Sequence, residues 1–427
     1  MKKVLVITYY WPPTGGSGVQ RWVKFTKYLQ RFGWQSIVYT PQNPEQLAVD
    51  ESLLKDVSPD VTVIKTHISE PYAIYKRFFK SSDKGAGVNP LNQQKKSFKQ
   101  KLAILLRGNL FVPDPRAGWV NPSVRFLRKY LKDNPVDAVV TTGPPQSMHL
   151  IGLKLKRLTG VRWIVDFRDP WTEMHYFKHM GLLPCTAKWH RRLEQQVIDE
   201  CDAVISVSSP VRDDFQARTS TPVILLTNGY DTEDFAAEPP ALPADRFTLV
   251  HTGLFASDGN PVKLWDVLAA KCAEDAEFKR QLRIRLAGKT DTEIVESLNV
   301  RGLSGNVENL GYLPHPQTVE LQRSANVLML PLRQEPEYAK ALPGKIFEYM
   351  AARRPVLGIG QEGGAAATML SDSGAGVMYD WDRTEPIRNF IDASWERHLQ
   401  GTDGPCTGNI AAYSRLELTR RLAEEVL

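Results

Sequence analysis

Short apolar runs recur along the chain, and each is followed by turn residues and a longer amphipathic stretch. In the N-terminal half these runs lie at 4–8, 36–40, 61–66, 138–142, 162–167, 203–208 and 223–229. Short apolar runs that alternate with helical patterns indicate a parallel sheet with helices on both faces. The pattern therefore predicts an α/β fold of the doubly wound, Rossmann-like type.

The same pattern starts again after a segment rich in proline, alanine and acid, DTEDFAAEPPALPADR. Further apolar runs follow at 247–253, 283–288, 326–332 and 354–360. A chain of 427 residues is long for one domain and comfortable for two. We predict α/β domains over about 1–232 and 245–395, joined by that linker. The tail 409–427 has the periodicity of one long amphipathic helix.

Basic residues are distributed unevenly. The net charge is +6, with a balance of +14 over residues 1–230 and −8 over the rest. Much of the excess lies in 71–110, where nine basic residues stand against Asp83 alone and aromatic residues are interspersed. That mixture suits a segment on an anionic membrane surface, and a solvated, poorly ordered insertion is the alternative.

Compartment and membrane topology are constrained by what the sequence lacks. No stretch approaches the roughly 18–20 apolar residues of a membrane helix. The apolar start is interrupted by Pro12 and Pro13, which favours a first strand over a signal peptide. The cysteines are scattered, without metal-ligand spacing: Cys185, Cys201, Cys272 and Cys406. We predict a cytoplasmic protein that is peripheral on the inner face of the membrane if 71–110 binds lipid.

A glycine-rich corner, YYWPPTGGSGVQR, follows the first apolar run at residues 9–21. Gly15, Gly16 and Gly18 resemble a dinucleotide fingerprint whose final glycine is missing. Glycines let backbone N–H groups approach an oxyanion, and the following helix adds its positive end. The corner is therefore a candidate phosphate site, with a plain strand-to-helix turn as the alternative.

Two further loops are expected at the same edge of the first sheet. TTGPPQSMH ends at His149, which either meets a substrate hydroxyl or caps a helix. WIVDFRDPWTE holds the densest chemistry, including Arg168 and Asp169. A carboxylate there can orient sugar hydroxyls or act as a general base, and Arg168 can stabilise negative charge. An internal Arg–Asp network that holds the loop is the alternative.

In the second half the strongest segment is ALPGKIFEYMAARRPVLGIG, where a Pro-Gly-Lys turn opens a helix. Gly344 and Lys345 converge there on a candidate diphosphate site. Glu348 follows one helical turn later and is a candidate for binding the ribose diol. Lys263, near the start of the first helix of this half, is a candidate phosphate contact, with a solvated lysine as the alternative. Lys289 directly follows another strand and is a candidate for contacting a base or a phosphate.

Taken in order, the chain's motifs resemble those of the retaining family-4 glycosyltransferases. The matching segments are YYWPPTGGSGVQR, TTGPPQSMH, VDFRDPW, VSSPVRDDF, TNGYD, HTGLF, GYLPHPQTVELQRSANVLMLPL and PGKIFEYMAARRPVL. The resemblance implies a GT-B fold, in which two Rossmann-like domains face a cleft and a last helix crosses back to the first domain. It also implies an acceptor on the N-terminal domain, a nucleotide sugar mainly on the C-terminal one, retention of anomeric configuration and no required metal.

Carried over by position, Gly15 and Gly16 match the family's glycine loop, Lys263 its phosphate-binding lysine, and Glu348 the second glutamate of its E-x7-E pattern. The sequence departs from that pattern where Lys340 stands in place of the first glutamate, which normally contacts the donor sugar. Glu337 is a substitute if the loop is offset.

Two other family residues are also replaced. Phe255 stands near the place of an arginine, with Lys345 as the alternative source of charge. Arg168, beside Asp169, occupies the place of a histidine common near the catalytic centre.

The expected function is transfer of a sugar from a nucleotide-diphosphate sugar to a glycan or lipid-linked hydroxyl, in surface polysaccharide or glycoconjugate biosynthesis. A catalytically degenerate GT-B protein is the first alternative, because of Lys340. A nicotinamide-dependent oxidoreductase is disfavoured, since Thr40 and Pro41 stand where an acidic residue is expected. A metal-dependent transferase has only Asp380 and Asp382 to support it, without further ligands.

Overall fold

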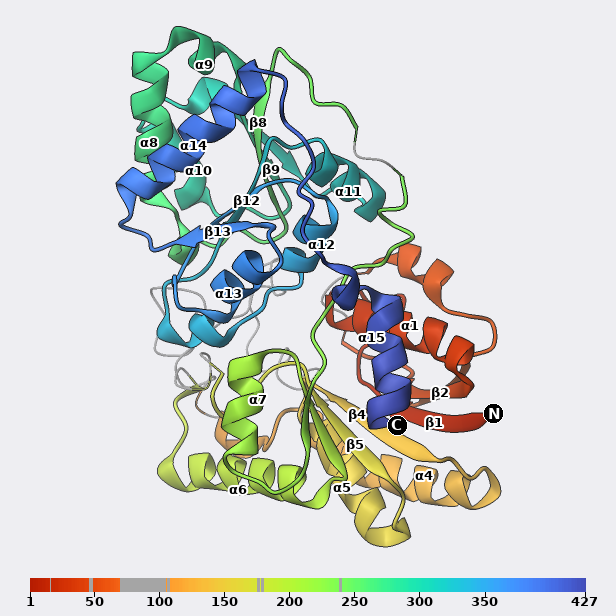
Figure 1. Cartoon of the computed structure of the whole chain (residues 1–427). Coiled ribbons are helices and arrows are strands. Elements are labelled where there is room, and N and C mark those ends of the chain that lie inside the picture. The colour runs from red at the N-terminus through yellow and green to blue at the C-terminus, as the bar shows by residue number, and fades with distance from the viewer. Residues whose placement is uncertain are drawn as a thin grey trace. The chain divides into compact units, whose positions relative to one another are not determined.

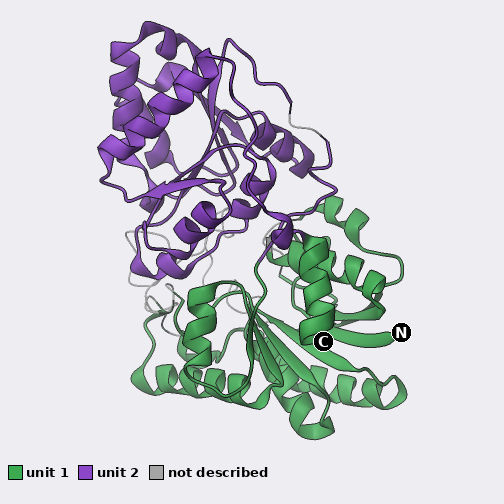
Figure 2. Ribbon diagram, in the orientation of Figure 1, with its two compact units in different colours: residues 1–227, 415–427 green, residues 228–414 purple. Residues whose placement is uncertain are grey.

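The computed structural model describes residues 1–15, 17–45, 49–69, 105, 108–174, 177, 180–237 and 240–427. These residues form two compact units. Unit 1 comprises Met1–Thr227 and Arg415–Leu427, and unit 2 comprises Asn228–Ser414 (Figure 2). Most of the basic segment 71–110 lies outside the described residues, so its membrane role stays a prediction.

Unit 1 is built on a seven-stranded sheet in the order β3-β2-β1-β4-β5-β6-β7. All of its strand pairs are parallel. The strands are β1 Lys2–Ile7, β2 Trp34–Pro41, β3 Thr62–Thr66, β4 Ala138–Gly143, β5 Trp163–Phe167, β6 Ala203–Ser206 and β7 Val223–Leu225. The order reverses direction between β1 and β4, which makes the carboxyl ends of these strands the expected place for a ligand.

Helices cover both faces of this sheet (Figure 1). The helices are α1 Ser17–Leu29, α4 Val120–Asp133, α5 Ser147–Thr159, α6 Pro184–Glu200, α7 Ser209–Gln216 and α15 Arg415–Arg421. Leu5 and Ile7 of β1 belong to a core cluster with α4–α7, whereas Val4 and Val6 belong to one with α1 and α15. Because successive strand residues point to opposite faces, α4–α7 and α1/α15 lie on opposite sides of the sheet.

Unit 2 repeats the architecture with six parallel strands in the order β10-β9-β8-β11-β12-β13. The strands are β8 Phe247–Thr252, β9 Leu282–Ala287, β10 Val307–Gly311, β11 Val327–Pro331, β12 Val356–Ile359 and β13 Gly376–Tyr379. The helices are α8 Val262–Glu274, α9 Ala276–Gln281, α10 Thr292–Asn299, α11 His315–Arg323, α12 Lys345–Ala351, α13 Ala365–Asp372 and α14 Thr384–Leu399. The predicted α/β fold with two parallel sheets is confirmed.

The segment expected to be a linker lies along unit 2. Arg354 Nη2 donates to the carbonyl of Pro240 at 2.7 Å, and Arg323 Nη2 donates to that of Ala237 at 2.5 Å. Each guanidinium satisfies a carbonyl of a chain that has no regular partner strand. These two contacts attach the segment to the end of α11 and to the loop that precedes β12.

The tail differs from the single helix predicted over 409–427. A short 3₁₀ turn over Ala411–Tyr413 comes first, and α15 begins only at Arg415. Ser414 has an extended backbone with φ −68° and ψ 143°, which interrupts the helical hydrogen bonds. The chain then returns to unit 1, where α15 and the π-helical turn Leu422–Val426 complete the core.

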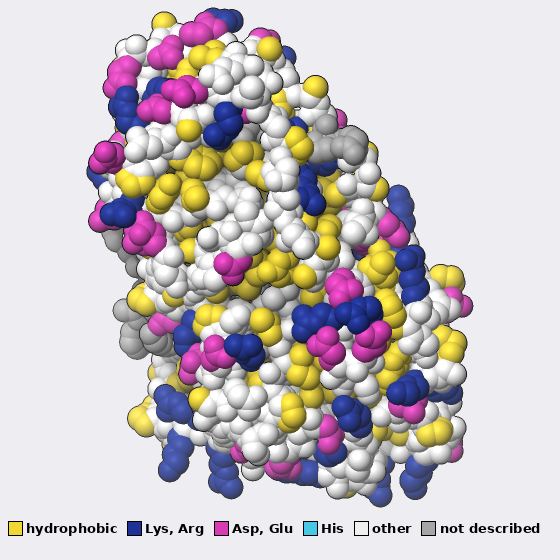
Figure 3. All heavy atoms as spheres, viewed as in Figure 1, with side chains coloured by type: hydrophobic (Ala, Val, Ile, Leu, Met, Phe, Trp, Pro, Cys, Tyr) yellow, Lys and Arg dark blue, Asp and Glu magenta, His cyan; other side chains and the backbone are white. Residues whose placement is uncertain are grey.

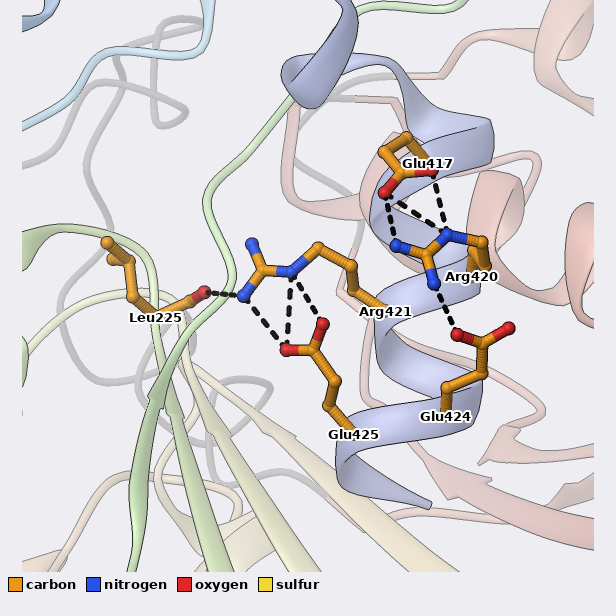
Figure 4. Close-up of polar contacts among 6 residues, drawn as sticks. All are labelled: Leu225, Glu417, Arg420, Arg421, Glu424 and Glu425. Carbon is orange, nitrogen blue, oxygen red and sulfur yellow. Dashed lines mark hydrogen bonds and ion pairs between the residues drawn. The ribbon is translucent and has the colours of Figure 1, made fainter.

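Apolar and charged side chains of this tail face opposite ways. Leu418, Leu422 and Val426 are buried beside α1 in the core of unit 1. Arg420 pairs with Glu417 and Glu424, and Arg421 pairs with Glu425 (Figure 4). Arg421 Nη2 also donates to the carbonyl of Leu225 at 3.3 Å, at the end of β7. The chain's last residues are therefore part of the N-terminal unit's structure.

We expect Leu422→Ala to destabilise unit 1 by about 2–5 kcal/mol, since it leaves a cavity in a core the surroundings cannot refill. Leu422 is fully buried there. Thermal unfolding followed by circular dichroism measures the loss. Glu424→Ala is the matched control, because an exposed ion pair on the same tail contributes less than about 1 kcal/mol. Equal melting temperatures for the two variants would contradict the packing of the tail.

Candidate functional site

The glycine corner lies between β1 and α1, at the carboxyl edge of the first sheet. Gly16 lies outside the described residues. Gly18 is in the first turn of α1, and a Cβ built on it would lie 1.6 Å from Nη1 of Arg168. No larger residue fits there without displacing the guanidinium. At Gly18, the glycine is explained by the close approach of this arginine from the loop after β5.

Arg168 is fixed by backbone carbonyls of the loop that follows β4. Its Nε donates to Gly143 O at 3.1 Å, and its Nη2 donates to Pro144 O at 2.5 Å. Burial lowers the pKa of Arg168, and the nearby charges of Asp169 and Asp166 oppose that shift. Arginine remains protonated in proteins, so the site carries a fixed positive charge. Three loops at the carboxyl edge thus meet around one cation.

A buried ion pair between Arg21 and Asp166 lies beneath these loops. Both side chains are 0% exposed, and Nη2 of Arg21 lies 3.0 Å from Oδ1 of Asp166. Trp22 Nε1 and Thr142 Oγ1 donate to the other carboxylate oxygen at 2.7 and 2.9 Å. Burial alone would raise the pKa of Asp166, but the Arg21 charge and the hydrogen bonds from Arg21 and Trp22 hold it below its usual range. Asp166 is therefore ionised and structural.

The rest of the VDFRDPWTE loop is held by α6. The Glu194 carboxylate accepts hydrogen bonds from Trp171 N, Thr172 N and Thr172 Oγ1 at 3.1, 3.2 and 2.7 Å. Trp171 Nε1 donates to Nδ1 of His190 at 3.0 Å. These residues and Asp166 therefore form an internal hydrogen-bond network that holds the loop, which is the alternative that the sequence left open. Asp169 is half-buried between the fixed Arg168 and the anchored Trp171.

His149 is fully buried in the first turn of α5. Its Nδ1 lies 2.9 Å from Thr141 Oγ1, and its ring packs on Phe167 with centroids 4.6 Å apart. Burial lowers its pKa to about 3. A Cβ on Gly143 would lie 2.5 Å from Nε2, so the chain at Gly143 covers the ring. The geometry favours a packing role for His149 over contact with a substrate hydroxyl.

In unit 2, Lys345 reaches from the start of α12 to the carboxyl end of β8. Its Nζ lies 3.3 Å from His251 Nε2 and 3.4 Å from Leu254 O. Gly253 has φ +93°, and a Cβ there would lie 3.3 Å from Nζ. Burial lowers the pKa of Lys345 to about 8, although the charge of Glu348 opposes the shift. The ammonium is therefore desolvated and held against a turn that favours glycine.

His251 accepts the hydrogen bond from Lys345. Its Nδ1 lies 3.1 Å from the carbonyl of Met329, and its Nε2 lies 3.4 Å from that of Leu254. Because a carbonyl can only accept, the shorter contact and the Lys345 ammonium facing Nε2 assign the proton to Nδ1. Nε2 is then the acceptor that faces Nζ. Burial and the Lys345 charge lower the pKa of His251 well below its ordinary value, so the ring is neutral. Sequence reasoning missed His251; its position at the end of an apolar run, in HTG, was the available signal.

Glu348 lies one helical turn after Lys345 and is fixed by Gln322. Nε2 of Gln322 donates to Glu348 Oε2 at 3.0 Å and to Thr252 Oγ1 at 3.0 Å. The next loop along the sheet approaches closely, since a Cβ on Gly288 would lie 2.3 Å from Gly253 O. Gly344, Lys345 and Glu348 thus lie together beside two glycine-containing loops at the strand ends.

The other donor-site candidates of unit 2 are Lys263 and Lys289. Lys263 lies in the first turn of α8 with 45% of its side chain exposed, and its Nζ is 3.6 Å from Asp266 of the same helix. Lys289 is exposed after β9, where its carbonyl accepts from Phe255 N at 2.9 Å. Lys340 ends the 3₁₀ helix Pro336–Lys340, which also carries Glu337.

Neither a metal cluster nor a membrane-spanning helix occurs in the parts of the chain that the structure describes. No group of three or more His, Cys, Asp or Glu side chains there is arranged to hold a metal ion. No helix among these residues has the length and apolar character that a membrane span requires.

Three solved structures illustrate the similarity in fold. A glycosyltransferase from Rickettsia africae is 14% identical with a TM-score of 0.63, covering 100% of this chain and 97% of that one. Anabaena HepE, in complex with UDP-glucose, is 16% identical with a TM-score of 0.60 and coverage of 100% and 99%. The lipopolysaccharide biosynthesis glycosyltransferase WaaG is 14% identical with a TM-score of 0.55 and coverage of 99% of both chains. A search of curated proteins finds no significant match.

Family models match both units. The model described as Glycosyltransferase Family 4 matches residues 89–234, and the model described as Glycosyl transferases group 1 matches residues 246–391. Together the two matches span more than half of the chain, and the solved structures share its two parallel-sheet domains. The chain therefore belongs to the family-4 glycosyltransferases of the GT-B fold.

Proposed function

We propose that this glycosyltransferase moves a sugar from a nucleotide-diphosphate sugar to a hydroxyl of a glycan or lipid-linked acceptor, with retention of configuration. The observation that carries the proposal is the desolvated Lys345 ammonium, held by His251 Nε2 and Leu254 O with Glu348 one turn away. A similar fold in Anabaena HepE binds UDP-glucose, which supports a nucleotide-sugar donor.

The donor is assigned to unit 2. The Lys345 ammonium contacts the diphosphate, whose negative charge grows as the leaving group departs. Gly253 and Gly288 allow the backbone to lie close to the donor, and Gly344 precedes Lys345. Glu348, oriented by Gln322, accepts hydrogen bonds from the ribose diol. Lys263 and Lys289 stay predictions as phosphate contacts.

The acceptor is assigned to unit 1. Arg168, fixed by Gly143 O and Pro144 O, stabilises negative charge near the reacting centre, and Asp169 orients the acceptor hydroxyl. Gly15 contributes its backbone N–H group at the same edge, and Gly16, outside the described residues, stays a prediction. The acceptor attacks the face from which the leaving phosphate departs, and that phosphate takes the hydroxyl proton. Fixed cations supply the charge that a metal supplies in other transferases, so we propose that no metal is required.

Surface polysaccharide or glycoconjugate biosynthesis is the proposed pathway class. WaaG, a glycosyltransferase involved in lipopolysaccharide biosynthesis, has the same fold across nearly the whole of both chains. We propose that the protein acts in the cytoplasm on an acceptor at the inner face of the membrane.

A catalytically degenerate GT-B protein remains the second candidate, because Lys340 stands where the family has a glutamate that contacts the donor sugar. A panel of UDP-, GDP- and ADP-sugars, scored by protection against thermal unfolding, identifies the donor class. Transfer assays with the protecting donor and NMR of the product's anomeric proton then test turnover and retention. Protection without transfer to any acceptor supports the degenerate protein, and protection by NAD(H) alone overturns nucleotide-sugar binding.

We expect Lys345→Met to lower kcat/KM by roughly 10²–10³-fold, because a cation aimed at the leaving diphosphate is lost while side-chain volume is kept. The melting temperature of the free protein should change little. Steady-state kinetics with the identified donor measures the effect. Lys279→Met, at an exposed lysine of α9, is the control. Near-wild-type transfer by the Lys345 variant would overturn its assignment.

Donor affinity should fall as the pH rises above about 8. The Lys345 pKa of about 8 in the free protein rises when a diphosphate binds, because the anion favours the charged form. Binding near pH 8.5 then takes up a proton, and affinity decreases with a limiting slope of about tenfold per pH unit. Isothermal titration calorimetry in buffers of different ionisation enthalpy measures the uptake. Equal proton uptake by wild type and Lys345→Met would refute the linkage.

Gly18→Ala should lower transfer at least about tenfold while changing stability by no more than about 1 kcal/mol. The new methyl group occupies the place of Arg168 Nη1, a side-chain end that can move away. Alanine also favours the helix, which offsets part of the cost. Kinetics and thermal unfolding are compared with Gly363→Ala, a site with nothing within 4 Å of the new Cβ. Full activity in Gly18→Ala would remove Arg168 from the proposed machinery.

A further inference from the structure

Three helices of unit 1 form a layer whose outer face is strongly basic. α4, α5 and α6 lie side by side over one face of the sheet (Figure 1). Along the lower margin of Figure 3, where this layer is seen edge-on, Lys and Arg side chains project outward. The exposed basic residues of the three helices are Arg125, Arg128, Lys129, Lys132, Lys154, Arg157, Lys188, Arg191 and Arg192.

Most of these charges have no ion-pair partner among the residues that the structure describes. On the central helix α5, Arg157 pairs with Glu200 and Lys154 Nζ donates to Asn121 Oδ1 at 2.6 Å. The basic residues of the two outer helices have no ion-pair partner anywhere in the described parts of the chain: Arg125, Arg128, Lys129, Lys132, Lys188, Arg191 and Arg192. Apart from Glu200, which is paired with Arg157, the exposed carboxylates of the three helices are Asp133 and Asp199. The layer therefore presents an unbalanced positive field.

Large apolar side chains are exposed among these charges. Trp189 is 53% exposed on α6, between Lys188 and Arg191, and Leu183, just before that helix, is 51% exposed. Leu158 on α5 is 52% exposed, and Phe126 on α4 is 41% exposed. A solvated basic face does not require exposed tryptophan and leucine side chains. Tryptophan beside lysine and arginine is typical of the boundary between lipid headgroups and acyl chains.

We propose that the outer face of α4, α5 and α6 docks on an anionic lipid bilayer. The basic side chains are attracted to the surface charge, and Trp189 and Leu183 enter the headgroup boundary. The inference deepens the proposed function and rests on its lipid-linked or membrane-proximal acceptor. It involves residues separate from Lys345, Glu348 and Arg168, so it can fail without affecting the proposed transfer reaction.

Vesicle flotation of the full chain tests the proposal. The vesicles are phosphatidylcholine with or without about one third phosphatidylglycerol. We expect binding to the anionic vesicles only, weakening as salt screens the charges. The test variants are Lys129→Glu with Lys132→Glu on α4, Arg191→Glu with Arg192→Glu on α6, and Trp189→Ala. Each charge-reversal pair should lower the partition coefficient by more than about tenfold.

Lys55→Glu with Lys279→Glu is the matched control, with the same change in net charge. Lys55 is exposed on the 3₁₀ helix Glu51–Asp56, which packs against α1 on the opposite side of the sheet, and Lys279 is exposed in unit 2. This control should bind as wild type does. Melting temperature and donor protection are measured for every variant and should not change.

Three outcomes would overturn the proposal. In the first, the control and test variants lose binding equally, which would mean that net charge alone drives attachment. In the second, the wild type binds neutral and anionic vesicles equally or binds neither. In the third, the full chain binds duplex DNA but no vesicle, which would assign the basic face to nucleic acid. If the wild type binds vesicles but no nucleotide sugar protects it against thermal unfolding, the result would instead count against the proposed transfer function.

Discussion

The buried ion pair between Arg21 and Asp166 holds the carboxyl edge of the first sheet together. Arg21 extends from α1 and also donates to the carbonyls of Leu226 and Thr227, at 2.8 and 2.7 Å. Asp166 on β5 accepts from Thr142 on β4. One pair thus joins α1, the strands β4 and β5, and the end of the segment Met1–Thr227. Removing one partner of such a pair costs about 3–5 kcal/mol, because the other charge is left buried.

Both candidate cations above the strand ends are positioned by neutral acceptors. Arg168 donates to two backbone carbonyls, and Lys345 donates to a neutral imidazole and a carbonyl. These contacts orient the charge without the direct carboxylate partner that Lys263 has in Asp266. A cation so held keeps most of its attraction for an anionic ligand, at the cost of desolvation. That cost is visible in the lowered pKa of Lys345.

The sequence was sufficient where the signal is local. Apolar periodicity predicted both sheets, and the Pro-Gly-Lys turn predicted that Lys345 and Glu348 lie together. It was insufficient where the reason lies far along the chain. The need for glycine at position 18 comes from the close approach of Arg168, and the position of the Lys345 ammonium is set by His251. The two residues of each pair are far apart in the sequence, so no local sequence pattern reveals either contact. Helical periodicity also does not distinguish a buried His149 from an exposed one, nor detect the extended Ser414 that delays α15.

The basic helix layer and the loop that holds Arg168 are connected within unit 1 by hydrogen bonds and helix packing. Asp114, shortly before α4, accepts from Ser147 N at 2.8 Å and from Ser147 Oγ at 2.7 Å, which caps the start of α5. The segment it caps follows Gly143 and Pro144, whose carbonyls bind Arg168. α4 and α5 pack together directly beyond this cap. A bilayer that bound the outer face of these helices would therefore set the orientation of the Arg168 loop relative to the lipid surface, because few soft torsions separate the two.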